Sequence, residues 1–188
     1  MASEVRARMI DGAAQLLARQ GLQATSFSEV LELTGAPRGS VYHHFPEGKD
    51  QLVGAAVDRA GEFLLAAVDP GEGATAEQVV ERFLAVWRSV LTGSECRSGC
   101  AVVAVTVATD SSALLNHAAE VFRSWRSRLA ALLEAGGLSG EDARRFGTVL
   151  VAAVEGAVVL SRADASVEPF ELVAADLQVQ VRQLAGKG

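Results

Sequence analysis

The sequence predicts an all-α protein of about nine helices, with an N-terminal three-helix helix-turn-helix domain and a larger helical domain. Apolar residues recur at three- and four-residue spacing throughout the 188 residues, as in helices that bury one face. A hydrophobic content of 49% argues against disorder, and a mean hydropathy of +0.23 suggests extensive burial, including a subunit interface.

The first helix is expected over Ala2–Gln20, ending at Gly21. Ser26 and Glu29 form the S-x-x-E pattern of a capping box, which predicts that the second helix starts there and exposes amide groups to an anion. Gly35 supplies the corner that follows this helix, and Pro37 suits the first turn of a third.

The third helix is notable for its polar side chains. Five hydrogen-bonding residues fall within seven positions: Arg38, Ser40, Tyr42, His43 and His44. Val41 and Phe45, four residues apart, are expected to face inward, and Gly39 would let the backbone approach a phosphate or sugar. Such a helix suits insertion into the DNA major groove, although an ordinary polar surface hairpin would show the same features.

Five more helical segments and one ambiguous segment follow. A helix over residues 48–68 ends before Asp69-Pro70-Gly71, and another covers 75–91. The valine-rich segment 99–109 is compatible with a buried strand but is predicted as a helix, because a lone strand would leave its backbone groups unsatisfied. Three more helices are expected. The first runs from about Leu114 to Gly136-Gly137, the second begins after a cap at Ser139, and the third covers about Phe170–Leu184.

Residues 25–49 resemble the DNA-binding domain of TetR-family transcriptional regulators. The resemblance is carried by the residues that the family pattern shares with this chain, Gly39, Ser40, Val41, Tyr42, His44, Phe45 and Lys49, and it extends back through the first helix. The form Pro-Arg-Gly-Ser-Val-Tyr-His-His-Phe-Pro-x-Gly-Lys, with one extra residue before the lysine, is similar to the LmrA/YxaF-like subgroup. Pro37 departs from the family pattern, which often has Ser or Thr there, so one phosphate contact is missing.

The resemblance implies a division into a DNA-binding domain, residues 1–50, and an effector-binding and dimerisation domain, residues 51–188. Ser40, Tyr42 and Lys49 would contact phosphates, and Arg38 and His43 are the candidates for base edges. The expected DNA-binding set is Ser26, Arg38, Gly39, Ser40, Tyr42, His43, His44 and Lys49. The partner is a double-stranded operator, and the net charge of −6 is compatible with this because recognition needs only a local basic patch.

In the family the last two helices form a four-helix dimer interface, which implies a homodimer. The small residues Ala152, Ala153, Gly156 and Ala157 would permit close packing there. Because the helix around residues 146–160 is apolar on all sides, it is expected to be buried on every side. The predicted interface residues are Phe146, Leu150, Ala153, Ala157, Leu160, Phe170, Val173, Leu177 and Val181.

The larger domain is expected to bind a small apolar or aromatic effector, although the same aromatic residues could simply fill the core. The candidate pocket residues are Phe83, Trp87, Cys100, Val103, Val107, Phe122, Trp125 and Glu155. Glu155 is an acid in an apolar helix, so it needs a partner, either an effector group or an arginine such as Arg162. The subgroup resemblance also implies control of a neighbouring resistance or efflux gene.

Other functions receive less support. Cys96 and Cys100 could make a thiol- or metal-responsive regulator, but the pair has no second pair and no completing histidine, so neither a metal nor a cofactor is expected. No catalytic motif is found, so the chain is not expected to be an enzyme; a helical ligand-binding protein without DNA function is the remaining alternative. Glu155 interrupts the longest apolar run, 147–160, and the first residues lack a signal peptide, which predicts a cytoplasmic protein outside the membrane.

Overall fold

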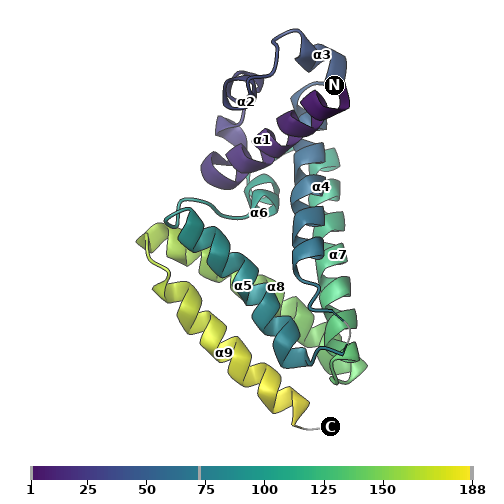
Figure 1. The fold of residues 1–188 in the computed structure, drawn as a ribbon, viewed down its shortest axis with the longest axis vertical. Coiled ribbons are helices and arrows are strands. Elements are labelled where there is room, and N and C mark those ends of the chain that lie inside the picture. The colour runs from purple at the N-terminus through teal and green to yellow at the C-terminus, as the bar shows by residue number, and fades with distance from the viewer. Residues whose placement is uncertain (1, 72, 187–188) are drawn as a thin grey trace. The chain divides into compact units, whose positions relative to one another are not determined.

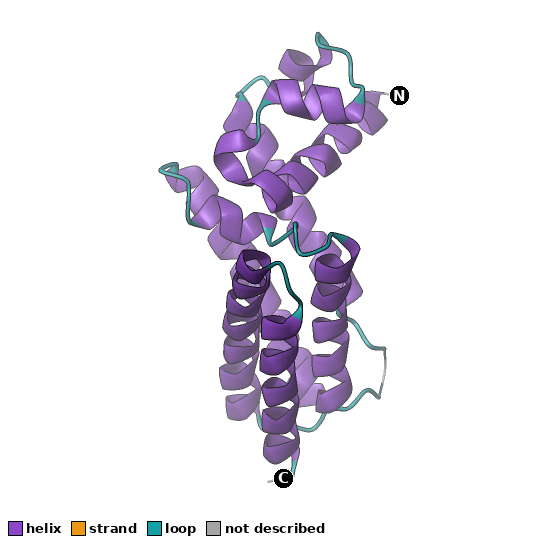
Figure 2. Cartoon of the chain, turned by 90° about the vertical axis from the view of Figure 1, so that its left-hand side faces the viewer, coloured by secondary structure: helices purple, strands orange, loops and turns teal. Residues whose placement is uncertain are grey.

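The computed structural model describes residues 2–71 and 73–186, and all of them lie in helices or loops (Figure 2). The helices are α1 (Ala2–Ala24), α2 (Phe27–Thr34), α3 (Ser40–His44), α4 (Lys49–Ala67), α5 (Ala76–Gly93), α6 (Ala101–Thr106), α7 (Ser112–Ala135), α8 (Gly140–Asp164) and α9 (Glu168–Ala185), labelled in Figure 1. The all-α prediction is confirmed, and the ambiguous segment 99–109 contains α6 and no strand.

The chain divides into two compact units. Unit 1 contains the residues up to Glu62 together with Cys100–Val121, and unit 2 contains Phe63–Gly99 and the residues from Phe122 onward. Of the three breaks, two fall inside helices, α4 and α7, so each of these helices contributes to both units; the third falls in the loop before α6. The functional boundary expected at residue 50 stays a prediction, because compactness and function need not divide a chain at the same residue.

Local sequence explains how α1, α2 and α3 are separated in unit 1. Gly21 breaks α1 with a φ of 81° and a ψ of 178°, and Gly35 ends α2 in the left-handed region with a φ of 64°. These are conformations that L side chains rarely adopt. At the start of α2, Ser26 Oγ accepts from the amide of Glu29 while Glu29 Oε2 accepts from the amide of Ser26, so the predicted capping box is present.

Two glycines bring α4 and α7 close together within unit 1. A Cβ at Gly54 would lie 3.3 Å from the ring of His117, and one at Gly61 would lie 2.8 Å from Cγ1 of Val121. Between them, Asp58 Oδ1 lies 3.2 Å from His117 Nδ1. Because the two glycines are seven residues apart, they lie on one face of α4, and they allow a helix contact that larger residues would widen.

Unit 2 is built around α8, which packs against α5 and α9. Figure 1 shows α8 and α9 running side by side in opposite directions after the turn that connects them. Arg88 of α5 holds α9 through a two-pronged ion pair with Glu171, at 2.6 Å from Nε to Oε1 and 3.0 Å from Nη2 to Oε2. The largest fully buried side chains of this unit are Phe83, Leu84, Leu91, Leu129, Leu133, Leu150, Phe170 and Leu177.

Within the single chain the helix α8 is not buried on every side, so the predicted burial on every side stays a prediction for an assembly. Val149, Val159 and Leu160 are exposed, and so are Ala152 and Gly156. By length and composition α8 could cross a membrane even though Glu155 interrupts its apolar run, so the expectation that no segment is long enough is wrong; however, 44% of its most apolar window is buried inside the protein. A core helix of a folded domain has the same composition, and the exposed apolar residues recur along one stripe of the helix.

Candidate nucleic-acid interface and effector region

The helix α3 is anchored by two apolar side chains. Val41 and Phe45 are buried, as predicted from their four-residue spacing, and the guanidinium of Arg6 lies 5.4 Å from the centre of the Phe45 ring. The amide of Phe45 donates to the carbonyl of Val41 and closes the helix. This anchoring fixes the orientation of α3 and leaves Tyr42 and His43 exposed, while Ser40 and His44 are half-buried.

Arg38, Tyr42 and His43 are exposed, and Tyr42 is 79% exposed. In the described part of the chain, Arg38 and Tyr42 have no hydrogen-bond or ion-pair partner; the ring of His43 only meets the ring of His44, edge to face, at 5.0 Å. Their donors are therefore available to an external acceptor. Phosphates and base edges are acceptors of the kind that such side chains bind on DNA.

Three other predicted DNA contacts already have partners within unit 1. Ser26 is engaged in the capping box, Ser40 Oγ donates to the carbonyl of Pro37 at 2.5 Å, and Lys49 Nζ donates to the carbonyl of Leu22 at 2.9 Å. An ammonium group has three hydrogens and a hydroxyl also accepts, so these groups can still meet a phosphate. Their structural role is to hold the start of α2, the turn before α3 and the start of α4.

Gly39 lies in an open place, because a Cβ built there meets nothing within 4 Å. Its φ of −69° is one that every residue adopts, so the fold itself does not require glycine. His44, the last predicted DNA contact, is half-buried beside Phe45, with ring centres 6.4 Å apart. The glycine and the partly covered histidine therefore differ from Arg38 and Tyr42, whose side chains extend into solvent.

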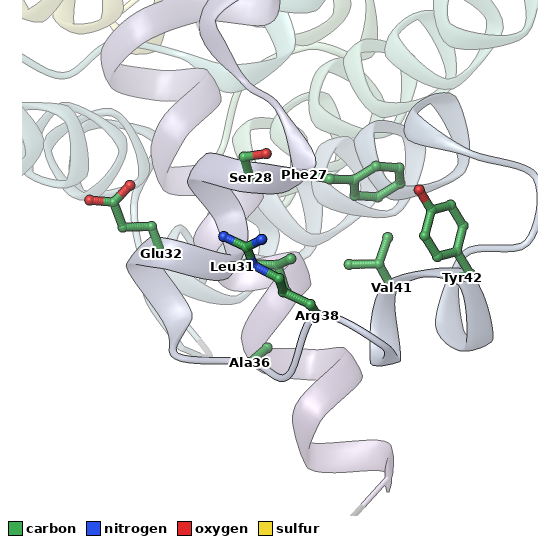
Figure 3. A pocket seen from close by; sticks show the side chains of 8 residues that line it. All are labelled: Phe27, Ser28, Leu31, Glu32, Ala36, Arg38, Val41 and Tyr42. Atoms are coloured by element: carbon green, nitrogen blue, oxygen red, sulfur yellow. The ribbon is translucent and has the colours of Figure 1, made fainter.

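An open hollow lies between α2 and α3, and sequence reasoning missed most of its wall. It has a volume of about 590 Å³ and is lined by Phe27, Ser28, Leu31, Glu32, Ala36, Arg38, Val41 and Tyr42 (Figure 3). In Figure 3 the side chain of Arg38 extends from the turn toward α2, and Tyr42 lies at the Phe27 end. Ser28 and Glu32, four residues apart and both exposed, were the sequence signal for an outward face of α2.

The residues predicted to bind an effector do not all fall in one unit. Phe83, Trp87, Phe122, Trp125 and Glu155 belong to unit 2, whereas Cys100, Val103 and Val107 belong to unit 1. Val107 is 78% exposed, so its placement in a pocket wall is wrong: α6 ends at Thr106, and its buried face carries Val102 and Val105. Val103 is half-buried, and Cys100 is buried at the start of α6, where its Sγ accepts from the amide of Val103 at 3.5 Å.

The aromatic side chains predicted to line a pocket in unit 2 are buried, except that Phe122 is half-buried. Phe83 and Trp125 line a narrow gap that has no room for a water molecule, and the ring of Trp125 meets Phe122 edge to face at 5.4 Å. Glu155 is half-buried and interacts within the chain, although its Oε2 is buried without a hydrogen bond. In this state the residues fill the core, and an effector would have to widen the gap.

The predicted interface residues lie mostly on the inner faces of α8 and α9. Six of them are buried within the single chain: Phe146, Leu150, Ala157, Phe170, Leu177 and Val181. Ala153 and Val173 are half-buried, and only Leu160 is exposed. These six residues therefore belong to the chain's own core, and the predicted interface stays a prediction. Both faces of α8 are apolar, and periodicity alone does not distinguish the chain's own core from a surface that meets a partner.

Cys96 and Cys100 are buried free thiols. Cys96 follows Glu95 in a loop where both residues have positive φ, 58° and 51°. Among the described residues, no three histidine, cysteine or acidic side chains gather where they could hold a metal ion.

The fold and the exposed α3 define a helix-turn-helix protein of the DNA-binding regulator class. The model of the bacterial regulatory proteins of the tetR family matches residues 9–56, and that of the LmrA/YxaF-like transcriptional regulator C-terminal domain matches residues 76–176. The chain therefore belongs to the TetR family, in its LmrA/YxaF-like group, and is a DNA-binding transcriptional regulator and not an enzyme.

Other transcriptional regulators are similar in sequence to this protein along most of the chain. A helix-turn-helix-type regulator of Mycobacterium tuberculosis is 34% identical, with 89% of each chain covered. The regulator YxaF of Bacillus subtilis is 30% identical, with 95% of each covered. A TetR transcriptional regulator of Chloroflexus aurantiacus has a similar crystal structure, with a TM-score of 0.80, 29% identity, and coverage of 97% of this chain and 96% of that one.

Proposed function

We propose that the protein is a cytoplasmic, homodimeric repressor that a small apolar or aromatic ligand releases from a pseudo-palindromic operator. In this proposal residues 1–50 bind DNA, and residues 51–188 bind the ligand and dimerise. Two copies of α3, related by a two-fold axis, would read two half-sites about 34–36 Å apart in the simplest arrangement. The available donors of Arg38, in the turn before α3, and of Tyr42, on α3, are the observation that carries this proposal.

The structure of α3 supports reading of DNA by side chains. Val41 and Phe45 hold the helix in place, so its outer side chains are presented without further ordering of the backbone. Arg38 has the planar fork that fits guanine O6 and N7, and Tyr42 can donate to a phosphate. Removing either side chain should leave the subunit folded, because neither has a partner within the described chain.

A homodimer is supported by the apolar stripe on α8. Val149, Ala152, Gly156, Val159 and Leu160 are exposed in the single chain, and a Cβ at Gly156 meets nothing within 4 Å. On α9, Leu172 and Val179 are also exposed. The free energy gained by burying such a stripe favours association, and a second copy presents the same stripe.

Release by a ligand is supported by the continuity of α4. Leu64, Leu65 and Val68, at the end of α4 and just beyond it, line the gap in unit 2, while the earlier residues of the same helix belong to unit 1. A ligand that widens the gap would act on α4 directly. A coupling of about 1–3 kcal/mol is typical of such regulation and changes DNA affinity about 5- to 150-fold.

The test is a gel shift at controlled salt concentration with the DNA that flanks the protein's own gene. Wild-type protein should bind specifically, and Arg38→Ala should lower the affinity about 5- to 150-fold. Arg144→Ala is the matched control, because it removes the same charge from an exposed position in unit 2 and should bind as wild type does. Equal weakening by both variants would show that only net charge matters and would refute reading by α3.

A further inference from the structure

Glu32 is an exposed carboxylate on α2 that the stability of this helix does not explain. It lies two residues before Thr34, the last residue of α2, where the helix dipole disfavours a negative charge. Glu29, another acid, precedes it by three residues on the same side of the helix. In the described part of the chain no hydrogen bond or ion pair of Glu32 compensates for these repulsions.

Glu32 shares the open hollow between α2 and α3 with Arg38, and these two are the charged residues of its lining. Figure 3 shows the Arg38 side chain extending from the turn toward α2, the helix that carries Glu32. Leu31, Ala36 and Val41 add apolar surface to the same hollow. Both charged side chains are long and exposed, and within the described chain neither has a partner. Two opposite charges therefore face one hollow without pairing.

Bound DNA would favour pairing of these two charges. In the free protein, water screens them, and an exposed ion pair contributes little to stability. DNA that lies against Arg38 would exclude water from the hollow, and the lower dielectric constant strengthens the attraction between the carboxylate and the guanidinium. The phosphates would also repel an unpaired carboxylate, and Arg38 is the cation that lines the same hollow.

From this juxtaposition we infer that Glu32 is a positioning residue for base recognition: in the DNA complex its carboxylate pairs with one edge of the Arg38 guanidinium and holds the other edge against a guanine. The five N–H donors of a guanidinium suffice for two bonds to the carboxylate and two to guanine O6 and N7. The inference rests on the proposed reading of DNA by Arg38 and adds what makes that reading selective. Glu32 weakens binding to every sequence by its charge, and with guanine the oriented fork compensates for this cost.

The test compares operators that differ at a single base pair. Selection from a random pool of double-stranded DNA gives the operator, and the base pair read by Arg38 is the position where Arg38→Ala loses its preference. Four operators with each base at that position are then bound to the full chain at one salt concentration, with fluorescence anisotropy as the readout. Ratios of dissociation constants are compared, because a change in net charge alone multiplies all four constants by one factor.

Wild-type protein should prefer guanine at this position by about 5- to 150-fold. Glu32→Gln keeps the size of the side chain and removes its charge, so the preference for guanine should fall about fivefold while binding to the other three operators becomes tighter. Glu32→Ala should act in the same direction. Because the carboxylate acts through Arg38, neither substitution should alter base preference in an Arg38→Ala background. Glu47→Gln is the matched control, since it removes the same charge from an exposed position of unit 1 outside the hollow and should leave the ratios unchanged.

The inference is overturned if Glu32→Gln and Glu32→Ala, both folded by circular dichroism, keep the wild-type preference for guanine. A change of base preference in the Arg38→Ala background would also overturn it, because Glu32 would then read a base by itself. An equal loss of preference in Glu47→Gln would show that position in the hollow is irrelevant. A guanine preference that needs Arg38 but not Glu32 would leave the proposed function in place, whereas the absence of any base preference that needs Arg38 would refute reading by Arg38 together with this inference.

Discussion

Replacing Val159 of α8 by glutamate should break the proposed dimer without unfolding the subunit. Val159 is 54% exposed in the single chain, so glutamate there would be solvated and would suit a helix. In a dimer that buries the stripe, each subunit would lose about 1 kcal/mol of apolar burial. It would also bury a carboxylate at a cost of at least about 2 kcal/mol, even after partial solvation.

The two-fold symmetry doubles this effect. The total is about 6 kcal/mol per dimer, which corresponds to an increase of about 10⁴-fold in the dimer dissociation constant. Sedimentation velocity over a concentration series, from nanomolar to tens of micromolar, measures that constant. Far-ultraviolet circular dichroism of the same samples reports whether the helices remain.

Val107→Glu is the matched control, because Val107 is an exposed valine that belongs to unit 1 and is not part of the stripe on α8. It should sediment as wild type does. A Val159→Glu protein that stays dimeric at nanomolar concentration would refute the assignment of the α8 stripe to the interface. Loss of the dimer in both variants would show that any added charge is enough, and would refute the argument from position.

Three further outcomes are expected. Gly39→Ala should keep the unfolding free energy within about 0.5 kcal/mol of wild type in a urea titration, since its Cβ meets nothing within 4 Å. The same variant should nevertheless weaken operator binding in a gel shift. Unchanged binding would show that the backbone does not approach DNA at this position. Gly61→Ala should destabilise the subunit by about 1–3 kcal/mol in the same titration, because its Cβ would lie 2.8 Å from Val121 Cγ1, and wild-type stability would contradict the close α4–α7 contact. Hydrogen bonds from Arg88 lower the pKa of Glu171 from its ordinary 4.5, so the ion pair stabilises the fold above that pH, and its contribution is lost as the pH falls through the lower folded-state pKa. At neutral pH the wild-type protein should therefore be about 0.5–1 kcal/mol more stable to unfolding than Glu171→Gln. A stability difference that persists at pH 2 would exclude this ion pair as its cause.

The local elements of the DNA-binding unit were predictable because short-range rules determine them. The capping box of Ser26 and Glu29 and the corner at Gly35 depend on residues within one turn of each other. The burial of Val41 and Phe45 follows from their spacing in the same way. The family resemblance supplied the function of this segment, and the structure added that Arg38 and Tyr42 have no partner within the described chain while Lys49 has one.

The helices, most of their ends and the DNA-binding motif can be predicted from the sequence, since caps, glycine corners and apolar periodicity are properties of neighbouring residues. Which apolar face of α8 forms the core follows from the packing of the whole subunit: Leu150 is fully buried, whereas Val159 is exposed. The structure also shows that Val107 is exposed and that, among the described residues, the buried Nε1 of Trp87 has no hydrogen-bond partner. These features depend on residues that are distant in the sequence, and the hydrophobic effect, which is non-directional, does not specify in advance which apolar surfaces will meet.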